Sequence, residues 1–467
     1  MATELPRLDP EVFRAQAHEL VDWMADYLAH VGEYPVQPQG QPGEIRARIP
    51  AAPPEAPEAF ERILGDFKEQ IVPGLMHWGH PGFFGYFPAN TSPPSILAEM
   101  LTATIGAQCM SWNTSPAATE LEQVMLEWLR QMLGLPAGFT GVLQDTASTA
   151  TLVALITARD AKVRQLDRLT VYTSAEANSS VPKGARLAGY SPERIRLIET
   201  DERAALSVPA LERAIAADQA AGLIPACVVA TLGTTGSTAI DPLPAVATLC
   251  RREAIWLHVD AAFAGSAAIL PELRWILDGA EHADSLVFNP HKWLLVNFDC
   301  SAYFVRDPAA LLRSFAASAE ILKASYDEKV VNYRDWGIQL GRRFRALKLW
   351  FVIRSYGVQG LQAMLREHIR LGKRFAEWVA SDPRFELMAE APLATVCFRQ
   401  RGAGNVDALN QQLLARLNAT GRVFLTGTRL RGHYVLRLAL GHLTTTEQDV
   451  AFAWELIQRL AQEAGPG

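Results

Sequence analysis

The segment Leu286–Phe298 reads LVFNPHKWLLVNF and places a lysine inside one of the most apolar passages of the chain. Lys292 is followed by the apolar run Trp293–Val296 and preceded, across three residues, by Val287 and Phe288. An ammonium group in a packed interior loses its hydration, which is costly unless the charge is paired or removed. The lysine either extends its head group to the surface, or has a pKa lowered by burial, so that its neutral amine forms a Schiff base.

The sequence around this segment alternates between strand-like and helix-like runs from about residue 90 to 355. The apolar runs ACVVATLG (226–233) and AIWLHVD (254–260) have strand length, and VPALERAIAADQAAG (208–222) has the spacing of an amphipathic helix. This alternation is typical of an α/β fold with a large, mainly parallel sheet and helices on both faces. In such sheets, ligands bind at the carboxyl ends of the strands.

The N-terminal part of the chain has a different texture. Residues 10–30 are predicted to form a helix, with Asp9 as its N-cap and Pro10 at its first position. The proline-rich segment 34–57 predicts an extended linker, and we expect the helical arm to pack on a second subunit. We predict an N-terminal helical segment at residues 1–88, a large α/β domain at 89–360 and a small α+β domain at 361–467.

The small domain is expected to begin with two long helices after about residue 360. A strand at 394–400, a helix at 407–421 and paired strands at 422–428 and 434–440 are predicted to follow. Thr444 and Glu447 have the spacing of a capping box, which predicts the start of the last helix.

The composition of the chain excludes several classes of protein. It has 467 residues, a formal net charge of −6 and five scattered cysteines. There is no basic field for nucleic acid or an anionic membrane surface, and no apolar run reaches the roughly 20 residues of a membrane helix. The N-terminus lacks the pattern of a secretory signal. We therefore predict a cytoplasmic protein with reduced thiols.

A first candidate site follows the short apolar run that ends near residue 144. Thr146, Ala147 and Ser148 are predicted to open a helix there, whose free N–H groups and hydroxyls are able to bind a phosphate. Small hydroxyl residues also cap many helices that bind nothing, so this signal is weak when taken alone.

Three further features lie where strands are predicted to end. Asp260 ends the run AIWLHVD, which for an isolated residue indicates only a cap, and Thr234 and Thr235 follow ACVVATLG. Lys292 follows a third strand. A phosphate cradle, a buried acid and a Schiff-base lysine, in this order, are what pyridoxal 5′-phosphate requires. The acid keeps the pyridine nitrogen protonated, and the lysine holds the aldehyde until an amino acid displaces it. No metal site is expected.

The chain resembles the group II pyridoxal-phosphate decarboxylases, and most closely the aromatic L-amino acid decarboxylases. The resemblance runs almost end to end and is carried by the segments MHWGHPGFFGYFPANTS, ASTATLVALITAR, AAGLIPACVVATLGTT, IWLHVDAAFAGSA, NPHKWLLVNFDCSA and DWGIQLGRRFRALKLWFVIRSYG. NPHKWLL with HVDAA upstream is a highly specific pair. The family implies fold type I of the pyridoxal-phosphate enzymes, with a seven-stranded sheet. It also implies a homodimer with an interlocked N-terminal segment and active sites at the subunit interface.

The resemblance also implies roles for individual residues. Lys292 matches the Schiff-base lysine and Asp260 the partner of the pyridine nitrogen, while Ala262 packs under the ring and Thr235 lies near the ring oxygen. The matching positions around the phosphate and the active-site wall are Thr146, Ala147, Ser148, Asn289 and His291. The matching positions of the aromatic pocket are Trp78, Tyr86, Phe87 and Pro88, followed by Ala89 where the family commonly has a threonine near the substrate carboxylate.

Two positions depart from the family pattern. Asn178, in SAEANSSV, stands where the family has a histidine that stacks on the pyridine ring. Ile321 aligns with a loop tyrosine that protonates Cα after CO2 leaves, and Tyr326 and Tyr333 lie on the same stretch out of register. The family implies that this segment, about residues 315–332, is a mobile loop that closes over the neighbouring subunit's site.

These departures predict the product. Loss of CO2 leaves a carbanion at Cα, and a positioned acid converts it to the amine. Without that acid, O2 takes electrons, and an aldehyde, ammonia and hydrogen peroxide result. In this family, a change at either position is associated with such aldehyde synthases. We therefore predict an aromatic aldehyde synthase with O2 as co-substrate. The alternative is an ordinary aromatic L-amino acid decarboxylase, in which Tyr326, His291 or a water supplies the proton.

Two other functional classes share part of this pattern. An aminotransferase uses the same aspartate and lysine, normally with an arginine of the small domain on the substrate carboxylate, but the end-to-end resemblance argues against it. A non-catalytic homologue is suggested by the lost tyrosine, and the intact Lys292 and Asp260 argue against that interpretation.

Overall fold

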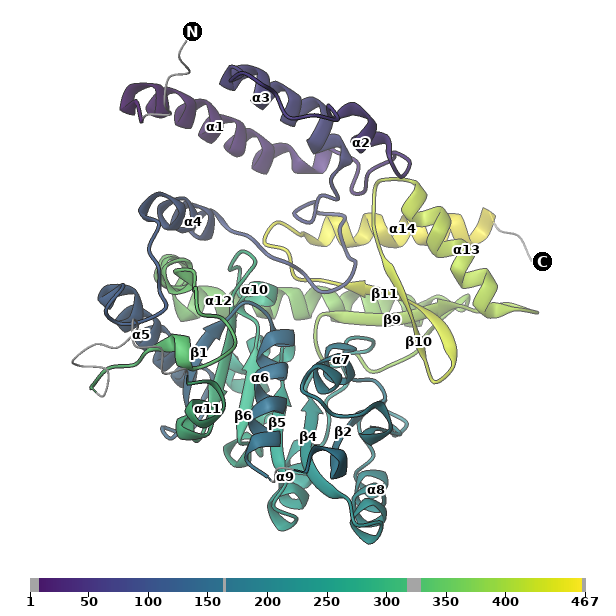
Figure 1. The fold of residues 1–467 in the computed structure, drawn as a ribbon. Coiled ribbons are helices and arrows are strands. Elements are labelled where there is room, and N and C mark those ends of the chain that lie inside the picture. The colour runs from purple at the N-terminus through teal and green to yellow at the C-terminus, as the bar shows by residue number, and fades with distance from the viewer. Residues whose placement is uncertain (1–7, 163–164, 317–328, 464–467) are drawn as a thin grey trace.

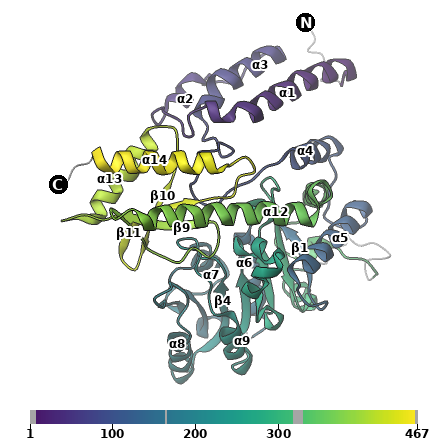
Figure 2. The same cartoon turned by 180° about the vertical axis from the view of Figure 1, so that it is seen from behind.

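The computed structural model describes residues 8–162, 165–316 and 329–463. A large sheet with its helices forms one end of the molecule, and a smaller sheet with its own helices lies against it (Figure 1). The N-terminal helices project from the far side of the small sheet, as the view from behind also shows (Figure 2).

The large sheet is mainly parallel, as predicted. Among the described residues it has seven strands in the order β1-β7-β6-β5-β4-β2-β3. The neighbouring strands β3, β2, β4, β5 and β6 run parallel, and β7 is antiparallel to both β6 and β1. The strands are β1 (Thr140–Gln144), β2 (Leu169–Ser174), β3 (Ile195–Ile198), β4 (Ile224–Thr231), β5 (Trp256–Asp260), β6 (Ser285–Phe288) and β7 (Ser301–Val305).

Helices cover both faces of this sheet because the side chains of its central strands alternate. On β4, Val229 packs in a cluster with Val181 of α7, whereas Val228 belongs to a cluster with Leu211 of α8 and Val246 of α9. Both faces are therefore apolar, which explains the nearly continuous hydrophobic runs of the sequence. The helices are α4 (Pro93–Ile105), α5 (Pro116–Leu133), α6 (Ala147–Asp160), α7 (Ser180–Leu187), α8 (Val208–Ala220), α9 (Leu243–Arg252), α10 (Pro290–Trp293) and α11 (Pro308–Phe315).

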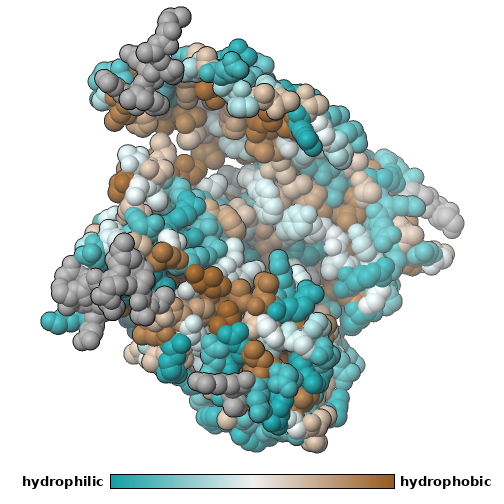
Figure 3. All heavy atoms as spheres, viewed as in Figure 1, coloured by the Kyte–Doolittle hydropathy of each residue, from teal (hydrophilic) through white to brown (hydrophobic). Residues whose placement is uncertain are grey.

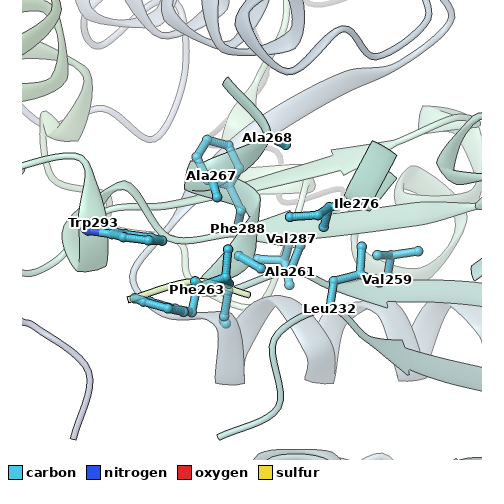
Figure 4. Packing of buried hydrophobic residues seen from close by; sticks show 14 of the residues in the cluster. Leu232, Val259, Ala261, Phe263, Ala267, Ala268, Ile276, Val287, Phe288 and Trp293 are labelled. Atoms are coloured by element: carbon cyan, nitrogen blue, oxygen red, sulfur yellow. The ribbon is translucent and has the colours of Figure 1, made fainter. Parts of the chain in front are cut away.

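The apolar residues around Lys292 fill the core beside the sheet. β6 ends at Phe288, and the one-turn helix α10 carries the lysine. Trp293 is fully buried, and its ring stacks on Phe263 with centroids 4.5 Å apart and planes at 8° (Figure 4). Lys292 itself is partly exposed. The apolar flanks therefore anchor the turn, and the half-buried lysine faces an internal cavity.

The small sheet is antiparallel, with the order β10-β11-β9-β8. Its elements are α12 (Arg345–Ser381), β8 (Phe385–Leu387), β9 (Thr395–Gln400), α13 (Val406–Ala419), β10 (Thr426–Leu430), β11 (His433–Ala439) and α14 (Glu447–Glu463). The prediction of two long helices after residue 360 is wrong. The element α12 consists of two helical segments joined at Gly357, whose φ of 64° is readily adopted by glycine, and the first of these segments lies before that point.

Two further boundaries in the small domain differ from the prediction. The capping box is formed by Thr446 and Asp449, whose backbone N–H groups each donate to the side chain of the other, and not by Thr444 and Glu447. β10 begins at Thr426 and not at 422, because the N–H of Phe84 donates to the carbonyl of Phe424 and that stretch pairs with the N-terminal segment instead.

The N-terminal helix is confirmed. It is α1 (Pro10–His30), and the Asp9 carboxylate accepts the N–H groups of Glu11 and Val12. The segment predicted as an extended linker contains the short helix α2 (Glu44–Arg48), and α3 (Phe60–Asp66) follows. None of the described helices is long and apolar enough to cross a membrane. All five cysteines are buried and unpaired.

Candidate active site

A cavity of about 210 Å³ lies at the carboxyl ends of the central strands. It gathers side chains from six separate segments, which the sheet brings to one edge. Its lining residues are Phe87, Thr146, Ala147, Ser148, Asn178, Ser180, Thr231, Gly233, Thr235, Asp260, Ala262, Asn289, His291, Lys292 and Phe298. The structure therefore brings together the residues predicted around the cofactor except Thr234, which is buried and whose hydroxyl accepts the Ala239 N–H.

Lys292 opens onto this cavity from α10. Burial lowers the pKa of its amine to about 8, an effect that the Asp260 carboxylate opposes and the Arg437 guanidinium reinforces. A substantial neutral fraction is therefore present near pH 8. The neutral amine is the form that attacks an aldehyde, so the environment prepares Lys292 for covalent chemistry.

Asp260 is the last residue of β5 and is 4% exposed. One carboxylate oxygen accepts the backbone N–H of Ala262 at 3.0 Å. Burial raises the pKa of this carboxyl group, whereas Lys292 and the Ala262 hydrogen bond lower it. A carboxylate in this position is able to accept a hydrogen bond from the protonated ring nitrogen of a flat ligand above the strand end.

The helix α6 begins at the edge of the cavity. Its N-cap is Thr146, whose hydroxyl oxygen accepts the Thr149 N–H at 3.3 Å. The Asp145 carboxylate in turn accepts the Thr146 N–H at 2.6 Å. Ala147 and Ser148 are the first two helical residues, so their N–H groups have no acceptor within the helix. This end of α6 therefore suits an anion such as a phosphate.

Asn178 lies on the cavity wall in a defined orientation. Its amide oxygen accepts the Ser180 N–H at 2.9 Å, and its amide nitrogen donates to the Thr235 hydroxyl oxygen at 2.9 Å. A carboxamide thus occupies the wall at the position where the family resemblance implies an imidazole. It has no proton to give at physiological pH.

His291 is a neutral imidazole. Its Nδ1 accepts the Cys300 N–H at 3.0 Å, so the ring hydrogen is on Nε2. Burial, together with the positive charges of Lys292 and Lys348, lowers the pKa of His291 to about 3. The ring is 4.7 Å from that of Phe298, between centroids.

An aromatic stack forms one side of the cavity. The ring of Phe87 lies on Phe263 with centroids 4.0 Å apart, and Phe263 lies on Trp293. The other aromatic residues predicted for this pocket form a separate group with Phe83 and Phe424. Trp78 and Tyr86 stack on each other at 5.6 Å. Together with Pro88, they do not line the cavity that the described residues form.

The predicted loop residues do not contribute to the described site. Ile321 and Tyr326 lie outside the described residues, as does most of the segment predicted to be mobile, 315–332. Tyr333 is 3% exposed and lies under the guanidinium of Arg342, 4.7 Å from the ring centroid. Burial raises the pKa of its hydroxyl. Tyr333 is therefore a core residue.

Residues 42–401 match the model of the pyridoxal-dependent decarboxylase conserved domain. The chain belongs to this family. The aromatic-L-amino-acid decarboxylase of Sus scrofa is 46% identical over 474 residues, which cover 97% of this chain and 96% of the relative. Tryptophan decarboxylase TDC2 of Camptotheca acuminata is 45% identical over 97% of this chain and 95% of its own length.

Solved structures agree with this assignment over the whole decarboxylase chain. The crystal structure of Oryza sativa TDC with PLP and tryptamine has a TM-score of 0.97 and 39% identity, covering 99% of this chain and all of that one. The Rhodiola rosea 4-hydroxyphenylacetaldehyde synthase has a TM-score of 0.93 and 37% identity, covering 98% and 99% of the two chains. The protein is thus a carboxy-lyase of fold type I that uses pyridoxal 5′-phosphate.

The lining of the cavity fits this cofactor. The amine of Lys292, with its lowered pKa, suits the cofactor's aldehyde. The buried carboxylate of Asp260 suits its pyridine nitrogen, and the N-terminus of α6 suits its phosphate. When bound, the cofactor supplies an electron-accepting ring to the substrate's Cα. The small side chain of Ala262 leaves space for a flat ring at the end of β5.

Sequence reasoning missed several residues of the decarboxylase site. Gly233 has a φ of 85°, and a Cβ there would lie 2.9 Å from that of Ala264, so glycine is needed where the chain turns after β4. A glycine directly after an apolar run was the available signal. Arg437 is buried on the apolar strand β11. The lone arginine in YVLRLAL was the available signal.

Proposed function

We propose that this decarboxylase converts an aromatic L-amino acid of the Phe, Tyr, Trp or dopa class to the aromatic acetaldehyde. The bond from Cα to the carboxylate breaks and CO2 leaves. O2 gains two electrons and two protons to become H2O2, and water replaces the nitrogen at Cα, which leaves as ammonia. The observation that carries this proposal is the amide of Asn178 on the cavity wall.

The supply of protons in the cavity supports this outcome. Within the described residues, the titratable side chains that line it are Asp260, His291 and Lys292. His291 is neutral well above its pKa of about 3 and is therefore a weak acid. Neither the amide of Asn178 nor the hydrocarbon of Ile321 is an acid. Lys292, with a pKa of about 8, is largely protonated at neutral pH and is the acid that competes with O2 in this cavity. Without the histidine and tyrosine of the family pattern, we propose that protonation at Cα is slow enough to leave the electron pair available to O2.

The proposal assigns the following roles. Lys292 holds the cofactor's aldehyde and is displaced by the amino group of the substrate, and Asp260 keeps a proton at the pyridine nitrogen. Ala262 lies under the ring and Thr235 near its oxygen. The phosphate and the site wall are contacted by Thr146, Ala147, Ser148, Asn289 and His291.

The aromatic substrate class is supported by two observations. The relatives named above act, by their names, on aromatic amino acids, and the Catharanthus roseus structure of this family contains L-tryptophan. Phe87 presents an aromatic ring to the cavity, backed by Phe263. Trp78, Tyr86 and Pro88 do not line the cavity of the single chain, and we propose that they belong to the aromatic pocket of the assembled dimer.

We also propose that the enzyme is a homodimer. The arm and the neighbouring α4 expose large apolar side chains, and Figure 3 shows apolar residues on the side of the arm that faces the body. These exposed residues are Val12, Phe13, Val21, Leu28, Ile63, Leu97, Leu101 and Ile105. A surface of this kind is normally covered by a partner.

The alternative is an amine-forming decarboxylase. It is favoured by the names of the relatives, most of which are decarboxylases. In that case a residue outside the described site, such as Tyr326, or an ordered water must deliver the proton.

One experiment separates the two products. The purified holoenzyme is incubated under air with phenylalanine, tyrosine, dopa and tryptophan, and CO2, O2 uptake, peroxide, aldehyde and amine are measured together. We expect CO2 and peroxide in comparable amounts, and more aldehyde than amine. Mainly amine without O2 uptake contradicts the aldehyde route. Phenylpyruvate without CO2, in the presence of a keto acid, would instead indicate a transaminase.

Reversion of the two departures tests the cause. Ile321→Tyr with Asn178→His is expected to shift the product towards amine, because a positioned acid is worth about 10²–10⁴-fold in a proton-transfer step. Leu322→Tyr is the matched control, since it adds the same side chain one residue out of register. An unchanged aldehyde-to-amine ratio in the double reversion would show that another group controls the reaction.

A further inference from the structure

The hydrogen bond between Asn178 and Thr235 has a fixed direction. The backbone N–H of Ser180 is only a donor, so the atom of Asn178 that faces it at 2.9 Å is the amide oxygen. The atom that faces the Thr235 hydroxyl at 2.9 Å is therefore the NH2 group. That group is only a donor, so Thr235 accepts, and the hydrogen of its own hydroxyl must point elsewhere.

The backbone on both sides of Thr235 is held in place. The N–H groups of Gly233 and Thr234 donate to the carbonyl of Ala239 at 2.9 and 3.0 Å. The carbonyl of Gly236 accepts from the Arg437 guanidinium at 3.1 Å. The backbone that carries Thr235 is therefore held by the fold. The Asn178 amide, which donates to the Thr235 hydroxyl at 2.9 Å, is the side-chain contact that orients this hydroxyl.

Both residues line the cavity that contains Lys292 and Asp260. We infer that Asn178 is a positioning residue that commits the Thr235 hydroxyl to donate its hydrogen into the cavity, to an acceptor oxygen of the bound cofactor. The amide is then an active part of the site and does not merely replace an imidazole. A neutral imidazole either donates or accepts according to its tautomer, so histidine at this position would not impose the same direction.

The inference concerns the resting holoenzyme. It depends on cofactor binding and does not depend on whether the enzyme makes aldehyde or amine.

Asn178→Asp is the decisive variant, because it keeps the shape and reverses the polarity. A carboxylate only accepts, so Thr235 must donate to it, and the hydroxyl hydrogen leaves the cavity. Asn178→Ala removes the partner and leaves Thr235 free to donate to the cofactor. We therefore expect Asn178→Asp to raise the dissociation constant of pyridoxal 5′-phosphate by about tenfold or more, the scale of one hydrogen bond to a charged acceptor, and Asn178→Ala by less than about threefold. The visible absorption band of the bound cofactor should shift in the aspartate variant.

Part of the aspartate effect arises from its negative charge, and a double-mutant cycle removes that part. Asn178→Asp is repeated in a Thr235→Val background, where no hydroxyl remains to be turned. We expect the aspartate to weaken cofactor binding several-fold less there than in the wild-type background. Thr235→Ser, which keeps the hydroxyl, should bind the cofactor like the wild type.

Asn405→Asp is the matched control, since Asn405 also accepts a backbone N–H near the start of a helix, at Ala408, but lies in the small domain outside the cavity. It should leave the dissociation constant unchanged. The inference is overturned if Asn178→Asp and Asn178→Ala weaken binding equally, or if the aspartate effect is the same with and without the Thr235 hydroxyl.

Discussion

The guanidinium carbon of Arg437 lies 4.5 Å from the centroid of the Phe87 ring, so a buried cation of the small sheet supports the wall of the Lys292 cavity. The amine of Lys292 is 5.0 Å from the same centroid. Arg437 also donates to the carbonyls of Gly236 and Tyr86. One side chain therefore ties together the small sheet, the loop after β4 and the segment that carries Phe87.

Replacement of Arg437 by methionine should raise KM for the aromatic substrate by about tenfold, with a smaller change in kcat. The methionine fills the volume but cannot hold the Tyr86 carbonyl, so the wall formed by Phe87 loosens while Lys292 and Asp260 stay in place. Steady-state kinetics give the two constants separately. Arg429→Met, on the exposed strand β10, is the control and should change neither. A fall in kcat as large as the rise in KM would point to a general defect of the fold.

Replacement of Lys292 by alanine should abolish turnover and the visible band of the bound cofactor, because no other amine lines the described part of the cavity. Borohydride reduction of the wild-type holoenzyme followed by digestion should give one labelled peptide, containing Lys292. Labelling of a different lysine would overturn the assignment.

Replacement of Asp260 by asparagine should leave cofactor bound and remove most of the activity. The amide keeps the size of the side chain, but it does not keep a proton on the pyridine nitrogen, so the ring stops accepting electrons. Cofactor content by absorbance and CO2 release separate the two effects. Turnover close to wild type would mean that Asp260 only accepts the N–H of Ala262.

The stability of the cofactor-free protein should depend on the pKa of Lys292. Burial holds this pKa at about 8, below its ordinary value of 10.5. The unfolded chain therefore binds more protons than the folded chain between about pH 8 and 10.5, and stability conferred by this residue rises with pH in that window. Relative to Lys292→Met, the wild type should gain roughly 3 kcal/mol across it and nothing below pH 8. Denaturant titrations at several pH values measure this difference, and a flat difference would show that the amine titrates normally.

The buried ion pair between Glu122 and Arg342 should be sensitive to the loss of one partner. The two side chains are 3% and 4% exposed, their contact is 2.7 Å, and Glu122 also accepts the Leu143 N–H at the end of β1. Glu122→Gln leaves a buried guanidinium without its counter-ion and should cost about 3–5 kcal/mol of unfolding free energy.

Joint replacement of Glu122 and Arg342 by methionine should cost less than the single change, because no uncompensated charge remains. Arg366→Met breaks an exposed pair with Glu272 and should cost at most about 1 kcal/mol. Chemical denaturation compares all the variants. A cost for Glu122→Gln no larger than for Arg366→Met would contradict the role of the buried pair.

The sequence by itself determined the elements whose signals are local. Asp9 caps α1 because its side chain reaches the N–H groups two and three residues on. The position of Asp260 at a strand end followed from the run before it. Lys292 stood out because its apolar neighbours are core residues, whichever way the lysine itself points. Such features depend on a few consecutive residues, so a pattern of side chains is sufficient to predict them.

Only the tertiary structure decided the contacts between distant segments. The strand β10 starts late because Phe424 pairs with Phe84, a partner that no local pattern identifies. The Asn178–Thr235 hydrogen bond spans 57 residues and the Arg437–Tyr86 contact spans 351. The crossovers of the large sheet and the packing of the small sheet bring these distant residues into contact. The direction of each hydrogen bond then depends on which atoms face each other.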